Sequence, residues 1–160
     1  MRIGVRTLPS LLSVTLAIAV AACGAATPSG QPTQADAESA LAKLVAFAQA
    51  GNFTAMCEMG DGNCQRTLND VGVASVPAKA PVVVGTRVIE ASGNSRGGRV
   101  LEVCGTNGSD GRTYHSEILV FRDGANLRVI NPIYWSGISI ASGDRTAPSP
   151  NPITFTCPGQ

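Results

Sequence analysis

The single histidine of the chain, His115, stands two residues before Glu117 in the stretch RTYHSEILVF. Alternate residues of a β-strand point to the same face, so in a strand the imidazole and the carboxylate would lie side by side. A carboxylate can orient a neighbouring imidazole, and the two groups can then move a proton as acid and base. The same two residues form an ordinary solvated pair if this face of the sheet is open to water. Their role therefore depends on which face of the strand is buried.

No other catalytic pattern accompanies this pair. With one histidine in the chain, no Ser-His-Asp set can be argued, and no phosphate-binding glycine loop occurs. We therefore assign no catalytic residue and predict no cofactor.

Five cysteines occur in the chain, and those that follow the N-terminal region form a separate group of four: Cys57, Cys64, Cys104 and Cys157. An even number of cysteines in an exported domain indicates two disulfides, for which three pairings exist. We favour Cys57–Cys64, which would close a short loop, and Cys104–Cys157, which would hold a proline-rich tail against the body.

The alternative is a zinc or copper site in which these thiols join His115, Met56 or Met59. No C-x-x-C spacing supports such a site, and an oxidising compartment opposes free thiols, so no metal is predicted.

The first 23 residues have the features of an export signal. Arg2 and Arg6 make the start positive, the apolar run 8–20 is too short for an ordinary membrane span, and small residues follow it. The final stretch VAAC, residues 20–23, resembles the lipobox of bacterial lipoproteins, which has an apolar residue, two small residues and a cysteine. The resemblance implies cleavage before Cys23 and a diacylglycerol group on its thiol. The alternative is a plain secretory signal.

The chain therefore divides into a signal peptide (1–22), a lipidated cysteine with a flexible tether (23–34), a folded domain (35–141) and a tail (142–160). The tether is expected to be mobile because it has small and polar residues, prolines and no large apolar side chain. A lipid on one residue would hold the domain at a membrane surface outside the cytoplasm, on the outer membrane if the source has one.

The nearly neutral charge of the chain argues against nucleic acids as partners. Removal of Arg2 and Arg6 with the signal leaves ten of the 12 basic residues against 11 acidic ones, a formal charge of −1. No basic patch and no alternation of aromatic and basic residues occurs, so we expect no binding to nucleic acid.

Hydrophobic periodicity predicts helices first and strands afterwards. Thr33 and Asp36 have capping-box spacing, and an apolar stripe follows as far as Gly51. Two more short helices are expected, one in NFTAMCEM and one from Cys64 to Gly72. Four strands then follow in VVVGTRVIEA, RVLEVC, RTYHSEILVF and LRVINPIYW, and SGISIA would add an edge strand. Because turn-rich connections make such strands antiparallel, the predicted fold class is α+β, with N-terminal helices packed on a curved, four- to five-stranded meander sheet.

Two segments, LAKLVAFAQAGNFTAMC and EILVFRDGANLRVI, resemble the nuclear-transport-factor-2-like superfamily, the cone fold shared with ketosteroid isomerase and polyketide cyclases. The resemblance covers roughly residues 35–135 and implies a conical domain with a pocket between the sheet and the helices. Its members include isomerases, cyclases, dehydratases and non-enzymatic binding domains. Isomerases of this fold use a carboxylate base and a tyrosine-type donor. The nearest candidates here are Tyr114, Glu102, Glu117 and Tyr134, and no catalytic role is carried over to them.

The turn in RDGAN decides which face of the third strand is inside. A two-residue turn at Asp123–Gly124 would turn the more apolar face inward and leave His115 outside. A three-residue loop at Arg122–Gly124 would shift the register by one and point His115 into the cone, near Asn131. We favour His115 outside. The residues considered for a pocket are His115, Glu117, Tyr114 and Asn131.

These features predict a lipid-anchored extracytoplasmic binding or accessory protein of the cell envelope, without catalytic activity, that holds a small apolar ligand or a partner protein. One alternative is an enzyme of the isomerase, cyclase or dehydratase kind that uses His115 and Glu117 as acid and base. Another is an envelope interaction module that forms a homodimer. Polar groups converging in a dry pocket would favour the enzyme, an apolar pocket the ligand carrier, and a filled interior the interaction module.

Overall fold

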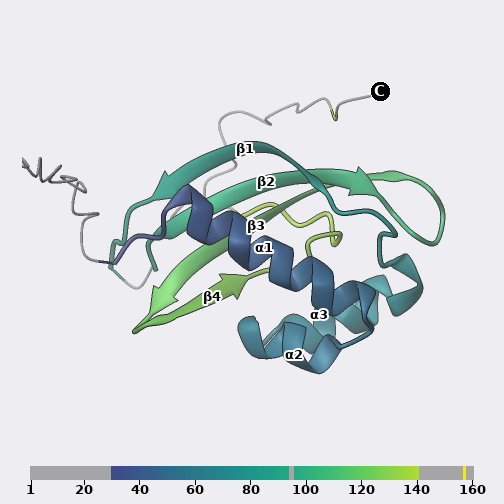
Figure 1. The fold of residues 1–160 in the computed structure, drawn as a ribbon, viewed down its shortest axis with the longest axis horizontal. Coiled ribbons are helices and arrows are strands. Elements are labelled where there is room, and N and C mark those ends of the chain that lie inside the picture. Colours follow the sequence, from purple (N-terminus) through teal and green to yellow (C-terminus); the bar gives the residue numbers. More distant parts are fainter. Residues whose placement is uncertain (1–29, 94–95, 141–156, 158–160) are drawn as a thin grey trace, which may run out of the picture.

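The structure, a computed structural model, describes residues 30–93, 96–140 and 157. This part of the chain has an α+β fold in which three α-helices precede a four-stranded antiparallel sheet (Figure 1). The helices are α1 (Gln34–Gln49), α2 (Phe53–Met59) and α3 (Cys64–Val71), followed by the short 3₁₀ helix η1 (Val73–Ser75). The strands are β1 (Val82–Ile89), β2 (Gly98–Thr106), β3 (Thr113–Asp123) and β4 (Asn126–Ile130), adjacent in this order. The expected signal peptide, Cys23 and the tail other than Cys157 lie outside the described residues.

Helix α1 begins where the sequence predicted. The Thr33 side chain accepts a hydrogen bond from the Asp36 backbone at 3.1 Å, and the Asp36 carboxylate accepts one from the Thr33 backbone at 3.0 Å. This capping box satisfies two of the helix's free N–H groups. Its buried stripe is Ala37, Ala40, Leu41, Leu44, Val45 and Ala48. The helix crosses one face of the sheet, and α2 and α3 lie beside one of its ends (Figure 1).

The residues just before α1 are packed on the body. The Gln31 side chain donates to the Ile89 carbonyl at 3.2 Å, and Arg99 Nε donates to the Pro32 carbonyl at 3.1 Å. Pro32 is fully buried. Gln31 and Pro32, which were expected in the flexible tether, therefore belong to the folded domain.

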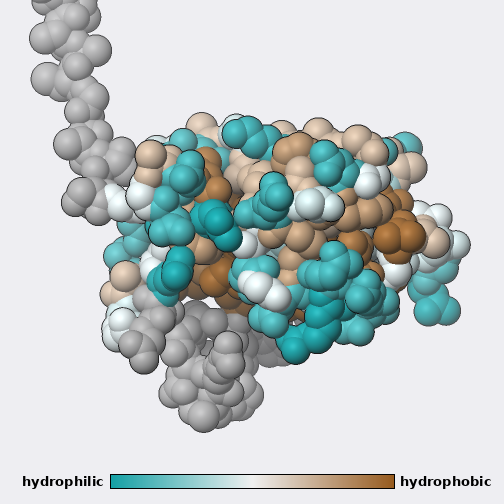
Figure 2. Space-filling view, turned by 90° about the horizontal axis from the view of Figure 1, so that it is seen from below, coloured by the Kyte–Doolittle hydropathy of each residue, from teal (hydrophilic) through white to brown (hydrophobic). Residues whose placement is uncertain are grey.

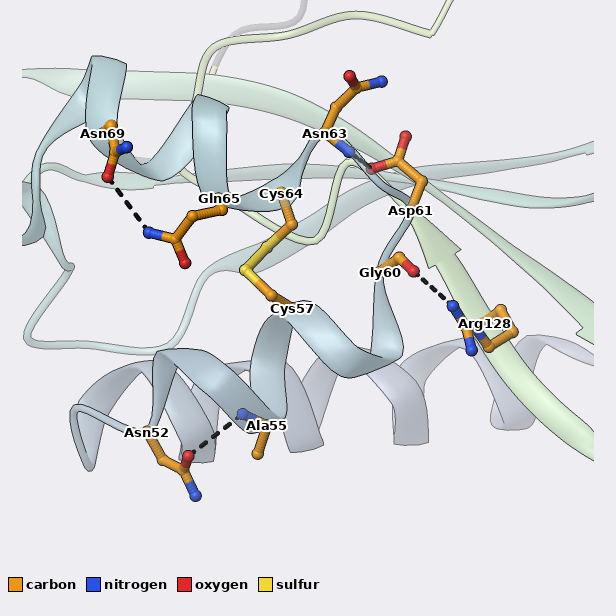
Figure 3. The surroundings of a disulfide bond; sticks show 10 residues. All are labelled: Asn52, Ala55, Cys57, Gly60, Asp61, Asn63, Cys64, Gln65, Asn69 and Arg128. Atoms are coloured by element: carbon orange, nitrogen blue, oxygen red, sulfur yellow. Dashed lines mark hydrogen bonds between the residues drawn. A yellow bond between two sulfur atoms is a disulfide. The ribbon is translucent and has the colours of Figure 1, made fainter.

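A disulfide between Cys57 and Cys64, with Cα atoms 5.3 Å apart, joins α2 to α3 (Figure 3). Arg128 on β4 donates to the Gly60 carbonyl in the intervening turn at 2.8 Å. A Cβ at Gly60 would come within 2.5 Å of the Pro132 ring, so the turn lies against the segment that follows β4. The disulfide and these contacts fix the two short helices to the sheet.

The hairpin between β3 and β4 differs from both registers expected for it. Asp123 pairs with Asn126, so the turn consists of Gly124 and Ala125, and Val120 pairs with Val129. Gly124 has a φ of 61°, the conformation that a type II′ turn requires at its first central position. With glycine at this position, Asp123 remains in β3, whereas both predicted turns placed Asp123 in the loop.

The last strand is also shorter than expected. β4 ends at Ile130 because Asn131 adopts a left-handed φ of 60° and Pro132 follows it. The segment SGISIA forms no strand over its described residues, 136–140. It still follows the free edge of β3, where the Glu117 N–H donates to the Ile138 carbonyl at 2.9 Å.

The main core lies between the sheet and the helices. On this side, which we call the helix side, the sheet contributes Leu101, Val103, Tyr114, Ile118, Val120 and Val129. The helices contribute the α1 stripe, Met56 and Leu68, and the segment after β4 adds Ile133, Tyr134 and Trp135. The largest of these side chains, including Leu44, Met56, Ile118 and Tyr134, are fully buried. The interior of the described domain is therefore filled by its own side chains.

Seen from below the view of Figure 1, apolar residues form a band between hydrophilic ones (Figure 2). The large apolar side chains that are exposed over the described residues are Val73, Val82, Val88 and Ile138. They belong to η1, to the two ends of β1 and to the segment after β4, so they do not come from one element.

Candidate functional site

The opposite face of the sheet, which we call the outer side, holds a buried cluster of three charged residues. Glu102 on β2 and Glu117 on β3 are directly paired across the strands, and Arg87 reaches them from β1. Arg87 Nη1 lies 2.7 Å from Glu102 Oε1 and 2.8 Å from Glu117 Oε1, and Arg87 Nη2 lies 2.9 Å from Glu117 Oε2. The guanidinium thus binds Glu117 with two nitrogens, the strongest geometry for such a pair.

This cluster buries both carboxylates. The side chains of Glu102 and Glu117 are 5% and 7% exposed, whereas that of Arg87 is 30% exposed. The hydrogen bond to Glu117 raises the pKa of Arg87 above its ordinary value, and burial works against this rise. Burying like charges side by side is costly unless an opposite charge stands between them. Arg87 therefore holds the two carboxylates together.

Room for Glu102 comes from a glycine in the neighbouring strand. Gly85 pairs with Glu102, and a bulge between Val83 and Gly85 sets this register. A Cβ at Gly85 would overlap the Glu102 carboxylate. The outer side of β1 is thus open at the position where the glutamate folds over it.

Glu117 also fixes the segment that follows β4. Its Oε2 accepts a hydrogen bond from the Ile140 N–H at 2.6 Å, and Arg87 Nη2 donates to the Ile140 carbonyl at 3.0 Å. The Asn131 side chain donates to the Glu117 carbonyl at 2.7 Å. The charged cluster is therefore the point where β1, β2, β3 and the segment after β4 are tied together.

The structure does not bring the expected pocket residues to one site. His115 and Glu117 share the outer side, as their spacing predicted, but both carboxylate oxygens of Glu117 are bonded to Arg87 or Ile140. His115 is half-buried beside Cys104. Tyr114 belongs to the helix-side core.

The Asn131 side chain donates a hydrogen bond to the Glu117 backbone, whereas Tyr114 packs in the helix-side core. The two residues therefore do not line one pocket. Of the other two candidates, Glu102 belongs to the charged cluster and Tyr134 to the core.

The helix-side interior holds the only two tyrosines of the chain. Tyr114 and Tyr134 have ring centroids 6.4 Å apart, and Tyr134 packs edge-on against Trp135 at 4.8 Å. Neither tyrosine hydroxyl has a hydrogen-bond partner among the described residues. Burial raises the pKa of Tyr134 to about 12 and raises that of Tyr114 further. These side chains fill the space between the sheet and the segment that follows β4.

An open groove of about 490 Å³ lies elsewhere, where β1 and β2 diverge. One wall consists of residues 78–80 with Val82, and the other consists of residues 104–108. Thr113 and Cys157 complete the lining, and the disulfide between Cys104 and Cys157, with Cα atoms 5.8 Å apart, lies within it. Its volume falls in the range of roughly 300–1,000 Å³ typical of ligand sites.

Both disulfides join the pairs that the sequence favoured. They indicate an oxidising, extracytoplasmic environment. Over the described residues, no group of three or more His, Cys, Asp or Glu side chains could hold a metal ion. None of the helices described has the length and apolar character needed to cross a bilayer.

Sequence reasoning missed Arg87 and the groove. Arg87 stands in a stretch of β-branched residues, where its charge signals a buried partner only once the register is known. One residue in the sequence could have indicated the groove. Pro81, directly before β1, has no N–H to extend the strand pairing and marks the point where β1 leaves β2.

Comparison with known proteins finds no match: none of the family models, curated proteins or solved structures is significantly similar to this chain.

Proposed function

We propose that the protein is a lipid-anchored, extracytoplasmic interaction module of the cell envelope that binds a partner protein in the groove between β1 and β2. The observation that carries this proposal is the contrast between a filled interior and an open groove at the rim of the sheet. A filled interior favours a surface-binding module over a carrier of a small apolar ligand inside the cone.

Anchoring is part of this proposal. The VAAC stretch supports acylation of Cys23, and the two disulfides agree with an exported chain. We further propose that the domain has the cone fold of the nuclear-transport-factor-2-like superfamily. The order of helices and strands and the antiparallel meander support this.

The enzyme alternative has less support. An acid–base role for His115 with Glu117 needs a carboxylate that can exchange a proton, and both oxygens of Glu117 accept other hydrogen bonds. The tyrosine hydroxyls are enclosed in the core. No second function is proposed.

Site-specific photo-cross-linking in cells tests the binding role. A photoreactive amino acid placed at Ala80 or at Thr106, on the two walls of the groove, should give the same cross-linked partner. The matched control is Asn126, an exposed residue at the tip of the β3–β4 hairpin. Partner bands that are absent at the groove positions, or equally strong at Asn126, would reject the proposal.

The anchor is tested separately by fractionation. The unaltered protein should stay with the membrane fraction, and Cys23→Ser should release it into the soluble fraction. Retention of the Cys23→Ser protein in membranes would contradict acylation at this residue.

A further inference from the structure

Beyond Cys104, the edge of β2 that faces β1 is unpaired by any described strand. The pairing of β1 with β2 begins at Val82 and Cys104, so Gly105 and Thr106 continue without a β1 partner. On their other side, both residues still pair with β3. The groove is thus an interruption of the sheet between two chain segments.

The register shows which backbone groups face the groove. Successive residues of a central strand direct their N–H and C=O groups to alternate neighbours. The Asn107 N–H donates toward β3, to the Arg112 carbonyl at 2.8 Å. The N–H and C=O of Thr106 therefore point the other way, into the groove. On the opposite wall, Lys79 and Ala80 make no backbone–backbone hydrogen bond to another described residue.

Both walls are held in position from behind. The Gln49 side chain at the end of α1 donates to the Ala78 carbonyl at 3.2 Å. The Gly108 N–H donates to the Ser75 carbonyl at 3.1 Å. A Cβ at Gly108 would overlap the Val76 carbonyl, so the loop after β2 is pressed against the segment after η1. These contacts hold both walls in position, so the groove has a defined width before any peptide binds.

The residues that line the groove indicate which kind of ligand it can bind. Most wall side chains are small, which lets another backbone approach closely, and Val82 offers an apolar contact because it is 52% exposed. Among the described residues of the lining, Lys79 is the only charged one. An incoming strand with a carboxylate near Lys79 would therefore be complementary in shape, backbone hydrogen bonding and charge.

We propose that the groove binds an extended, acidic peptide segment of the partner, which adds to the β2 edge at Thr106 and directs a carboxylate to Lys79. This inference rests on the proposed binding function and specifies the chemistry of the partner. Strand addition supplies affinity through the backbone, and the lysine supplies selectivity.

Nuclear magnetic resonance with a defined probe tests this inference. The protein is the chain from residue 24 to 160, with both disulfides formed. The probe is the acetylated, amidated hexapeptide TVEVTV, compared with the same peptide carrying Gln or Lys in place of Glu, and with a version N-methylated on alternate amides. The acidic peptide should shift the amide signals of Thr106, Asn107 and residues 79–82 in a saturable manner. N-methylation should abolish these shifts, because it removes the donors of strand pairing.

Variants separate the two contacts. Lys79→Ala should weaken the acidic peptide about two- to five-fold, as expected for an exposed ion pair, and should leave the Gln peptide unchanged. The control is Lys43→Ala, which removes an exposed lysine from α1 and should have no effect. Thr106→Pro removes the N–H in the groove and should abolish binding of all three unmethylated peptides.

Four outcomes would overturn the inference. They are equal binding of the Lys and Glu peptides, the same amide shifts from sodium acetate alone, retained binding of the N-methylated peptide, and shifts that depend on protein concentration without peptide. The last would identify a second copy of the chain as the occupant. If cross-linking from the groove succeeds and the peptide fails, only the peptide chemistry is wrong. Failure of cross-linking rejects the binding function itself.

Discussion

Arg87 on β1 reaches across β2 to bind Glu117 on β3, with nitrogen–oxygen distances of 2.8 and 2.9 Å. On the way it also binds Glu102, 15 residues away in the sequence. One guanidinium therefore bridges two buried carboxylates from different strands and compensates the charge of one of them.

Arg87→Leu should lower the free energy of unfolding by about 3 kcal/mol, because it leaves two buried carboxylates without a counter-charge. Urea denaturation followed by the fluorescence of Trp135 measures this loss. Arg112→Leu is the matched control. It breaks a pair with Asp110 at 3.6 Å in which the arginine side chain is 86% exposed, and it should change stability by less than about 0.5 kcal/mol. Equal losses for the two variants would refute a structural role for the cluster.

Both tyrosines should ionise well above pH 10. Burial raises the pKa of Tyr134 to about 12 and that of Tyr114 further, so tyrosinate absorbance of the native protein should show no step near the ordinary value of about 10. Because the pKa of each buried tyrosine is higher in the folded than in the unfolded protein, its contribution to the free energy of unfolding is complete below pH 10. For Tyr134 this contribution is lost as the pH rises from 10 through 12.

Tyr134→Phe should therefore make the decline in stability above pH 10 less steep. A spectrophotometric titration near 295 nm and urea unfolding between pH 8 and 11 measure the two effects. A tyrosine that titrates at pH 10 in the folded protein would show that the core is open to water.

Gly85→Ala should destabilise the fold by about 1–3 kcal/mol, because the new methyl group would overlap the Glu102 carboxylate that Arg87 holds. Glu102→Ala in the same chain should remove most of the additional cost, and a double-mutant cycle reports this coupling. Gly62→Ala serves as the control, since it has open space around its Cα and no left-handed φ. Additive losses for Gly85→Ala and Glu102→Ala would contradict the proposed contact.

The two disulfides should differ in their effect on stability. Cys104–Cys157 spans 53 residues and Cys57–Cys64 spans seven, so the chain-entropy relation gives about 4 and about 2 kcal/mol respectively. Replacing each pair by serine and comparing urea midpoints tests the order. Loss of the longer bridge should also reduce cross-linking from Thr106, because this disulfide lines the groove. The reverse order of stabilities would argue against a long closed loop.

The sequence was informative wherever local chemistry decides the structure. The capping residues Thr33 and Asp36 and the glycine turns marked the helices, and β-branched runs marked the strands. Alternation separated the two faces of β3, and the preferred placement of His115 outside agrees with the packing of Ile118 and Val120 on the helices. The turn from which that preference was argued lies one residue later than expected.

The sequence was uninformative about features that depend on the register between strands. The hairpin turn lies one residue later than expected, since Gly124 and not Asp123 takes the first turn position. The ion pair of Arg87 with Glu117 joins residues 30 apart, and only the pairing of three strands brings them together. Glu102 and Glu117 could be named as titratable candidates, but nothing local showed that one arginine would occupy both.

The hydrogen bond from Gln31 to the Ile89 carbonyl also places the N-terminal approach to the domain and the groove at opposite ends of β1. Gln31 reaches the sheet at the end of β1, whereas the groove opens at Val82, where the strand starts. Eight residues of strand span roughly 25 Å. If the anchor proposed at Cys23 holds the protein, its linker would enter the domain at the end of β1 that lies away from the groove. A partner bound in the groove would then not compete with the linker for the same end of the sheet.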